Sequence, residues 1–270
     1  LVLRLIREAV ADGGVALNYA PVEEILERDG RAAGVRLRDE AGERRADVYA
    51  RVVVNATGAW VDRLRAQVGG RPCVRPLRGS HLIFPAWRLP VAQAISFLHP
   101  LDRRPVFIFP WEGITLVGTT DIDHDQPLDE EPRIGGAEVS YLLAAVEGQF
   151  PSLGLGPGDV LATFAGVRPV IDTGKADPSK EARDHLVRME GGLISVTGGK
   201  LTTFRRMALD VLKAARRQGL DIPRFLRRMP VLNPVDVPLP GVALDEAQRR
   251  RLLGRYGAEA PALVAAAAPE

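Results

Sequence analysis

The chain is poor in cysteine, in lysine and in long apolar runs. Cys73 is the one cysteine among 270 residues, which excludes an internal disulfide and a cysteine-based zinc or iron–sulfur site. Apolar runs such as Ala262–Ala268 are much shorter than the roughly 20 residues of a membrane-spanning helix. Only four of the 36 basic residues are lysines, so a lone arginine is weak evidence for function and a lysine within a motif is stronger evidence.

The remaining composition is that of an ordinary globular protein. Hydrophobic residues make up 46% of the chain and charged residues 26%, which argues against disorder. The net charge of +2 is too small for the basic surface of a nucleic-acid-binding protein. The length allows one large or two ordinary domains. The chain starts at Leu1 inside an apolar-periodic stretch and ends in Ala-Pro-Glu, so we expect a piece of a longer protein.

The first 68 residues alternate between helical and extended patterns. Apolar residues recur every four positions in Leu1–Asp12, which predicts an amphipathic helix that ends at two glycines. The expected strands are Val15–Tyr19, Val22–Arg28, Ala33–Arg38, Arg45–Ala50 and the buried Arg51–Asn55. A helix over Trp60–Val68 follows. Together these patterns predict an α/β arrangement.

The middle of the chain has the texture of an antiparallel sheet. Expected strands are Ser80–Phe84, Val106–Pro110, Ile114–Gly118 and Val160–Ile171, with a helix over Gly136–Phe150. His185–Met189 and Leu193–Val196 look like paired strands. Further helices are expected at Leu201–Gln218, Leu244–Tyr256 and Ala260–Ala268. The middle segment is therefore α+β in character.

Two segments place small residues where a strand meets a helix. Ala56-Thr57-Gly58 follows a buried strand, and ligands of open α/β sheets bind at such strand ends. A plain strand-to-helix turn explains this segment equally well. Gly198-Gly199-Lys200-Leu201-Thr202 also joins a strand to a helix, whose N-terminal N–H groups suit an anion. An ordinary helix start capped by Thr202 or Thr203 is the alternative.

Single basic residues add weaker signals. Arg168 is held between Gly166-Val167 and Pro169, and its guanidinium suits a carboxylate or phosphate, although a surface arginine is the simpler interpretation. His81 opens an apolar strand and is a candidate general base. His124 lies among acidic residues, which could suggest a metal site, but a solvated acidic loop is favoured. We therefore expect no metal.

Read in order, these segments resemble one family. They are Asn-Ala-Thr-Gly-Ala-Trp, Arg-Gly-Ser-His, Val-Gly-Thr-Thr-Asp, Ala-Gly-Val-Arg-Pro and Thr-Gly-Gly-Lys-Leu-Thr-Thr-Phe-Arg. The chain resembles FAD-dependent glycerol-3-phosphate dehydrogenase from about Leu1 to Ala268. Val-Gly-Thr-Thr-Asp together with Gly-Gly-Lys-Leu-Thr-Thr is specific for that family.

The resemblance implies a fold with three parts. A partial Rossmann-type FAD-binding domain would comprise residues 1–68 and 186–220. An antiparallel-sheet substrate domain, residues 69–185, would interrupt it, and residues 228–270 would begin a helical C-terminal domain. The family's Gly-x-Gly-x-x-Gly motif is missing from this sequence, so the chain would carry about half of the FAD site.

The resemblance also implies an activity and a set of site residues. The family oxidises glycerol 3-phosphate to dihydroxyacetone phosphate, with hydride passing to FAD and electrons to a membrane quinone. Residues expected near FAD are Val22, Ala56, Thr57, Gly58, Gly198, Gly199, Lys200, Leu201 and Thr202. Arg168, Arg183 and Lys200 are expected to bind the substrate, and His81, Arg168 and Lys200 to take part in catalysis.

Two other functions stay open. A flavoprotein of the same fold that oxidises amino acids or hydroxyacids would share the Ala-Thr-Gly strand end, although such proteins usually lack Gly-Gly-Lys-Leu-Thr-Thr. An inactive truncated copy is the second alternative. The expected location is the cytoplasm, with peripheral association at the cytoplasmic membrane face and a homodimer left open.

Overall fold

A computed structural model describes residues 1–223, 228–232, 235–239 and 243–267, and the chain divides into two compact units. We call them the helical unit, which comprises Leu1–Pro21, Arg38–Arg45 and Ile222–Glu270, and the sheet unit, which comprises Val22–Leu37 and Ala46–Asp221. None of the described helices is long and apolar enough to cross a membrane.

The helical unit contains α1 (Val2–Ala11), α5 (Glu246–Tyr256), the 3-10 turn η7 (Gly257–Glu259) and α6 (Ala260–Ala266). Arg7 pairs with Glu259, and Arg4 donates to the Gly254 carbonyl at 3.2 Å. The three helices confirm the sequence prediction, although the last expected position of α6, Ala268, lies outside the described residues.

The strand expected at Val15–Tyr19 was wrong. These residues form an irregular segment, and Val15 is 86% exposed. An apolar run forms a strand only where a neighbouring strand supplies hydrogen bonds, and among the described residues none pairs with this segment.

Two small sheets follow in the sheet unit. The first has the order β1-β2-β3, where β1 is Val22–Arg28, β2 is Arg31–Arg38 and β3 is Arg45–Tyr49. The β1–β2 hairpin turns at Asp29 and Gly30, which both have positive φ, as a tight two-residue turn requires. The second has the order β11-β12-β4, where β4 is Val53–Asn55, β11 is His185–Glu190 and β12 is Leu193–Gly198.

The pairing of β4 with β12 is parallel, so their carboxyl ends lie at one edge of the sheet. The 3-10 turn η1 (Gly58–Trp60) and α2 (Val61–Gln67) follow β4, and the 3-10 turn η5 (Leu201–Thr203) and α4 (Phe204–Arg217) follow β12. Ile25, Val53, Leu64 and Leu193 form the core between α2 and these sheets. Both glycine-containing segments noted in the sequence therefore leave the same edge.

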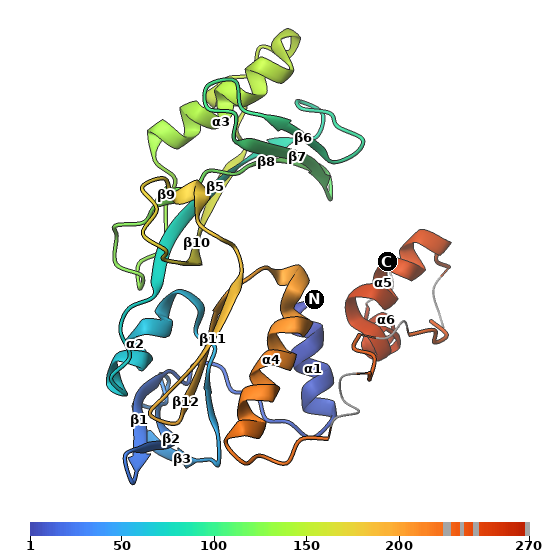
Figure 1. Ribbon diagram of the computed structural model, residues 1–270. Helices are drawn as coiled ribbons and strands as arrows, with labels where there is room; N and C mark the ends of the chain where they lie inside the picture. Colours follow the sequence, from blue (N-terminus) through green and yellow to red (C-terminus); the bar gives the residue numbers. More distant parts are fainter. Residues whose placement is uncertain (224–227, 233–234, 240–242, 268–270) are drawn as a thin grey trace. The chain divides into compact units, whose positions relative to one another are not determined.

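A larger antiparallel sheet has the order β10-β5-β8-β7-β6, with β9 paired to β5 (Figure 1). Its strands are β5 (Val74–Pro85), β6 (Ile95–Leu98), β7 (Pro105–Trp111), β8 (Ile114–Gly118), β9 (Ile122–Asp123) and β10 (Ala162–Ile171). The helix α3 (Gly136–Gln149) covers one face, where Leu142, Ala145 and Val146 pack against apolar side chains of β5, β7 and β8. The opposite face carries the functional candidates.

These elements confirm the expected fold class, a mixed α/β chain with an antiparallel α+β part. Both the parallel pair and the antiparallel sheet lie in the sheet unit. The strand β6 was not expected from the sequence. The division into residues 1–68 with 186–220, 69–185 and 228–270 stays a prediction, and part of the last range lies outside the described residues.

A buried ion cluster joins α2, the β11–β12 hairpin and the start of β5. Arg65, whose side chain is 1% exposed, donates to both carboxylate oxygens of Glu190 at 2.8 and 2.7 Å and also pairs with Asp62. Asp62 in turn accepts from the backbone N–H groups of Cys73 and Val74, each at 2.9 Å. The cluster therefore fixes the position of the start of β5 relative to α2.

We expect Arg65→Met to destabilise the protein by about 3 kcal/mol, because it leaves two carboxylates without their buried partner. Arg63→Met is the matched control on the same helix, since Arg63 and Asp129 form a pair that is 52% and 68% exposed. The control should change stability by less than about 1 kcal/mol. Urea unfolding measures both, and equal midpoints for the two variants would contradict the expectation.

Candidate functional site

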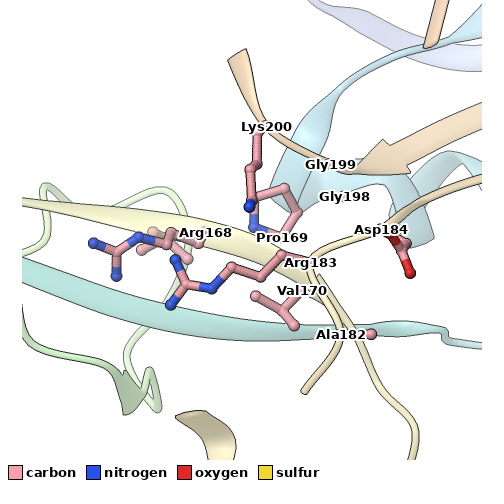
Figure 2. A pocket seen from close by; sticks show the side chains of 10 residues that line it. Arg168, Pro169, Val170, Ala182, Arg183, Asp184, Gly198, Gly199 and Lys200 are labelled. Carbon is pink, nitrogen blue, oxygen red and sulfur yellow. The ribbon is translucent and has the colours of Figure 1, made fainter. Parts of the chain in front are cut away.

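A pocket of about 310 Å³ lies where β10 meets the segments before β11 and after β12 (Figure 2). It is lined by Val167, Arg168, Pro169, Val170, Ala182, Arg183, Asp184, Gly198, Gly199 and Lys200. Two guanidinium groups and one ammonium therefore surround it. In Figure 2 the Asp184 carboxylate points away from the two guanidinium groups.

Arg168 lies against the sheet on one side and lines the pocket on the other. Its guanidinium lies directly on Gly79 of β5, where an added Cβ would be 1.9 Å from Nη1. Nη1 donates to the Thr120 carbonyl at 3.0 Å, and Nη2 donates to the Thr119 hydroxyl at 2.7 Å. Gly79 thus makes room for the guanidinium, and the segment after β8 fixes its orientation.

Asp121 bridges Arg168 and Arg183. Its Oδ1 accepts from Arg168 Nη1 at 3.0 Å, and its Oδ2 accepts from Arg183 Nη2. Burial lowers the pKa of Arg168, the Asp121 carboxylate opposes this, and the Arg183 charge lowers the pKa further. Asp121 is buried and does not line the pocket, so it holds the two cations together from behind.

The segment that carries Arg183 is anchored at both ends. Glu181 is buried and accepts hydrogen bonds from the backbone N–H and hydroxyl groups of Thr173. On the other side of Arg183, the carbonyl of Asp184 accepts a hydrogen bond from the Gly199 N–H at 3.1 Å. This anchoring keeps Arg183 next to the glycine loop and Arg168.

Gly198 and Gly199 both have a φ of +75°, which favours glycine. An added Cβ at Gly198 would lie 2.6 Å from the Asp184 carbonyl, and one at Gly199 would lie 2.7 Å from Met207 Sδ. Lys200 then caps η5, and its N–H donates to the Thr203 hydroxyl at 3.2 Å. Thr203 is the N-cap residue of α4, although its side chain makes no capping hydrogen bond to that helix.

Asn55 organises the Ala56-Thr57-Gly58 turn at the end of β4. Its Nδ2 donates to the Val61 carbonyl at 2.9 Å, and its Oδ1 accepts from the Thr57 hydroxyl at 2.7 Å. Thr197 of β12 donates to the Gly58 carbonyl at 3.2 Å, which ties this turn to the neighbouring strand. Gly58 has a φ of +62° and open space at its Cβ position. Backbone can approach a ligand closely here, as a flavin nucleotide requires.

His81 lies between Phe164 and Gly118. Its ring stacks on Phe164 with a centroid distance of 4.5 Å, and an added Cβ at Gly118 would lie 2.1 Å from its Cδ2. Burial, and next the charge of Arg168, lower the pKa of His81 to about 4. Its Nδ1 is buried and has no hydrogen-bond partner among the described residues. His81 is therefore neutral at ordinary pH.

The structure brings together some of the expected site residues and not others. One pocket is lined by Arg168, Arg183, Lys200, Gly198 and Gly199. His81 lies close enough to Arg168 for the arginine's charge to lower its pKa. Ala56, Thr57 and Gly58 lie at the neighbouring strand end, outside the lining. Leu201 and Thr202 are exposed at the start of η5. Val22 is not part of the pocket lining. It lies at the start of β1 and packs against the core cluster that contains Val53.

Sequence reasoning missed Asp121, Thr119, Gly79 and Phe164 as parts of the site. The Val-Gly-Thr-Thr-Asp segment was a usable signal, because it contains both Thr119 and Asp121. His124 is buried and has no partner for either ring nitrogen among the described residues. No group of three or more potential metal ligands occurs in that part of the chain.

Comparisons with known proteins show which family and fold the chain resembles. A family model described as FAD dependent oxidoreductase matches residues 1–205. The aerobic glycerol-3-phosphate dehydrogenase of Bacillus subtilis is 37% identical over 80% of this chain and 39% of its own length. That of Staphylococcus aureus is 29% identical over 95% of this chain and 50% of its own length.

A solved structure of glycerol-3-phosphate dehydrogenase from Bacillus halodurans, complexed with FAD, superposes with a TM-score of 0.79. It is 31% identical and covers 97% of this chain and 54% of that one. Glycine oxidase from Geobacillus kaustophilus, with a TM-score of 0.52 and 21% identity, shares the fold alone. The chain spans about half the length or less of the curated relatives it matches.

The lowered pKa of His81 gives a measurable pH dependence. The folded protein binds this proton less readily than the unfolded chain, so His81 lowers the free energy of unfolding as pH falls from 6.5 to about 4. We expect an NMR titration of His81 to give a pKa near 4. Arg168→Met should raise this pKa only in part, because burial, the larger cause, remains.

Arg88→Met serves as the control, since Arg88 pairs with Asp159 and is not among the groups that shift the His81 pKa. A wild-type pKa near 6.5 would contradict the burial argument. An Arg168→Met pKa identical to that of wild type would contradict the charge argument.

Proposed function

The chain belongs to the family of FAD-dependent oxidoreductases, and on that premise we propose that it oxidises glycerol 3-phosphate to dihydroxyacetone phosphate. The observation that carries the proposal is the pocket in which Arg168, Arg183 and Lys200 converge beside the neutral imidazole of His81. The named relatives, which are aerobic glycerol-3-phosphate dehydrogenases, support the same reaction.

The charge of the pocket favours a phosphate ester over a simple carboxylate. Three cations line it, and Asp121 behind them neutralises one charge. The Asp184 carboxylate also belongs to the lining but points away from the two guanidinium groups, so two positive charges remain on their side of the pocket. A phosphate monoester carries nearly two negative charges at neutral pH, whereas an amino acid or hydroxyacid offers one carboxylate. Arginine forks bind phosphate oxygens with charge-assisted hydrogen bonds. The second charge therefore favours glycerol 3-phosphate over the substrates of amino-acid oxidases.

His81 is proposed to accept the proton of the secondary hydroxyl. A neutral imidazole can take a proton, and an imidazolium cannot. Because Nδ1 is buried, Nε2 is the ring nitrogen that a substrate can reach. Phe164 and Gly118 keep the ring in one plane, so its lone pair has a fixed direction. Lys200, which lines the same pocket, supplies positive charge beside the reacting centre.

The residues of the two strand ends fit FAD. Gly198, Gly199 and the N-terminal N–H groups of η5 suit the part of the cofactor that becomes negative on reduction, and Ala56, Thr57 and Gly58 suit its nucleotide part. Leu201, Thr202 and Val22 complete the proposed set. Bound FAD supplies the acceptor for the substrate's hydride.

A membrane quinone is the proposed electron acceptor, and the proposed location is the cytoplasm with contact to the cytoplasmic face of the membrane. The shortage of cysteine agrees with a reducing compartment. The quinone acceptor and the location are proposed from the family resemblance, and so is a homodimer. Quinone reduction by vesicle-bound protein, compared with oxygen consumption, distinguishes the two acceptors.

The substrate assignment predicts that glycerol 3-phosphate reduces the flavin of the FAD-loaded protein, whereas amino acids and 2-hydroxyacids leave it oxidised. Arg168→Ala and Arg183→Ala should each lower kcat/KM by about 10- to 150-fold, because each removes a charge-assisted contact of roughly 1.5–3 kcal/mol. Flavin absorbance after mixing measures this. FAD content should stay that of wild type, and Arg63→Ala should change neither quantity. Unchanged efficiency in both arginine variants would place the phosphate elsewhere.

The proton-acceptor assignment predicts that His81→Gln slows flavin reduction by about 10²–10⁴-fold, the usual loss when a general base is removed. Glutamine retains a hydrogen-bonding side chain but cannot take the proton. Rapid mixing with saturating glycerol 3-phosphate measures the rate, and FAD content and melting temperature check the fold. A near wild-type rate with the same pH dependence would assign the proton to another group, with Lys200 the next candidate.

A further inference from the structure

Five glycines lie within the described strands, and four of them have a packing reason to be glycine. An added Cβ would meet a nearby atom at less than 3 Å at Gly34, Gly79, Gly118 and Gly198. At Gly79 and Gly118 those atoms belong to Arg168 and His81, the two side chains that the proposed reaction uses most. Gly166 is the exception, because nothing lies within 4 Å of its Cβ position.

Gly166 also has no conformational reason to be glycine. Its φ lies outside the positive region, and it is paired in register with Gly79 in the middle of β10. A glycine inside a strand weakens the strand, since its backbone loses more freedom on folding and it offers no side chain to pack. A glycine inside a strand often marks a bulge, a bend, or close approach of a ligand or another backbone. The register of β10 with β5 is unbroken through Gly166, which excludes a bulge.

The neighbours of Gly166 are the functional side chains. Residues two apart on a strand share a face, and directly opposed residues of an antiparallel pair share it as well. Phe164 and Arg168 therefore flank Gly166 on β10, while Gly79 and His81 lie opposite on β5. The stacked rings of His81 and Phe164 lie on one side of Gly166. The Arg168 guanidinium, which lies on Gly79, is on the other side.

This arrangement leaves an open floor between the proton acceptor and the anion-binding arginine. Phe164 and Arg168 are four residues apart, about 13 Å at the rise of an extended strand. Gly166 lies midway between them and has open space at its Cβ position, whereas the Arg168 guanidinium occupies the Cβ position of Gly79. On the other face of the sheet, side chains of β5, β7 and β8 pack against α3 in the core.

We propose that the space above Gly166 receives the carbon skeleton of a short polyol phosphate, with its phosphate at Arg168 and its secondary hydroxyl at His81. Gly166 is then a residue that determines specificity, because any side chain there would occupy the place of the substrate carbons. The proposal rests on the proposed function and adds to it where the carbon chain lies.

The test replaces Gly166 with Ala and with Val in the FAD-loaded protein. The Cβ that both residues add meets nothing within 4 Å, and valine favours extended backbone, so the melting temperature should stay the same or rise. The KM for glycerol 3-phosphate should rise about tenfold or more for Gly166→Ala, and further for Gly166→Val. Affinity for dihydroxyacetone phosphate, measured by calorimetry, should fall in parallel. A gain in stability with a graded loss of substrate affinity is not expected of a merely structural residue.

Gly158→Ala is the matched control. Gly158 also has open space at its Cβ position and no positive φ, and it lies in the 3-10 turn Pro157–Asp159 ahead of β10. The control should behave as wild type in every measurement.

The outcomes separate this proposal from the proposed function. If wild type oxidises glycerol 3-phosphate and both Gly166 variants do so with unchanged KM, the Gly166 proposal is overturned and the function stands. If the variants lose FAD while remaining folded, the space belongs to the cofactor and the proposal is overturned. If wild type reduces its flavin with a carboxylate substrate instead, the function and the polyol phosphate proposal both fail.

Discussion

Two like charges held at close range are the constraint on which this site depends. Arg168 and Arg183 come from a strand and a loop and repel each other, and the Asp121 carboxylate between them makes their proximity stable. Asp121 follows β8, Gly79 belongs to β5 and Arg168 to β10, so the arrangement exists only if these strands lie in the order β10-β5-β8. The long strand β5 is central to this order, because it pairs with β10, β8 and β9.

The site is built from flat backbone with large side chains lying on it. Gly79 lies under the Arg168 guanidinium and Gly118 under the His81 ring, so each functional side chain rests against main chain without a competing side chain. Glycine in a strand costs about 0.5–1 kcal/mol relative to alanine. The opposite face offsets this cost, since Leu82, Phe84 and Val117 are fully buried under α3. The core residues that stabilise the sheet thus lie on the face that packs against α3, and the candidate site residues Arg168 and His81 lie on the opposite face.

Local patterns predicted most of the elements, because helix and strand periodicity depends on neighbouring residues alone. They failed for Val15–Tyr19, where strand formation needs a distant partner. The motifs identified the glycine loop, Arg168 and His81, and the resemblance added Arg183. Sequence reasoning did not find the role of Asp121, since its partners are 47 and 62 residues away along the chain. In a chain with 32 arginines, the contact with Asp121 is what sets Arg168 and Arg183 together apart from surface arginines. The lowered pKa of His81 could not be predicted from the sequence for the same reason, because the contact with Phe164 that helps to bury His81 joins two different strands.

The lowered pKa of His81 links substrate binding to proton transfer. A base with a pKa of about 4 is weak, and part of its weakness comes from the Arg168 charge. A phosphate dianion bound at Arg168 opposes that charge, so the electrostatic contribution to the shift decreases when the substrate is in place. The contribution of burial does not decrease, because Phe164 and Gly118 remain against the ring. The arginine that is proposed to bind the phosphate therefore also contributes to the basicity of His81, and a bound phosphate would offset the part of the pKa shift that comes from the Arg168 charge.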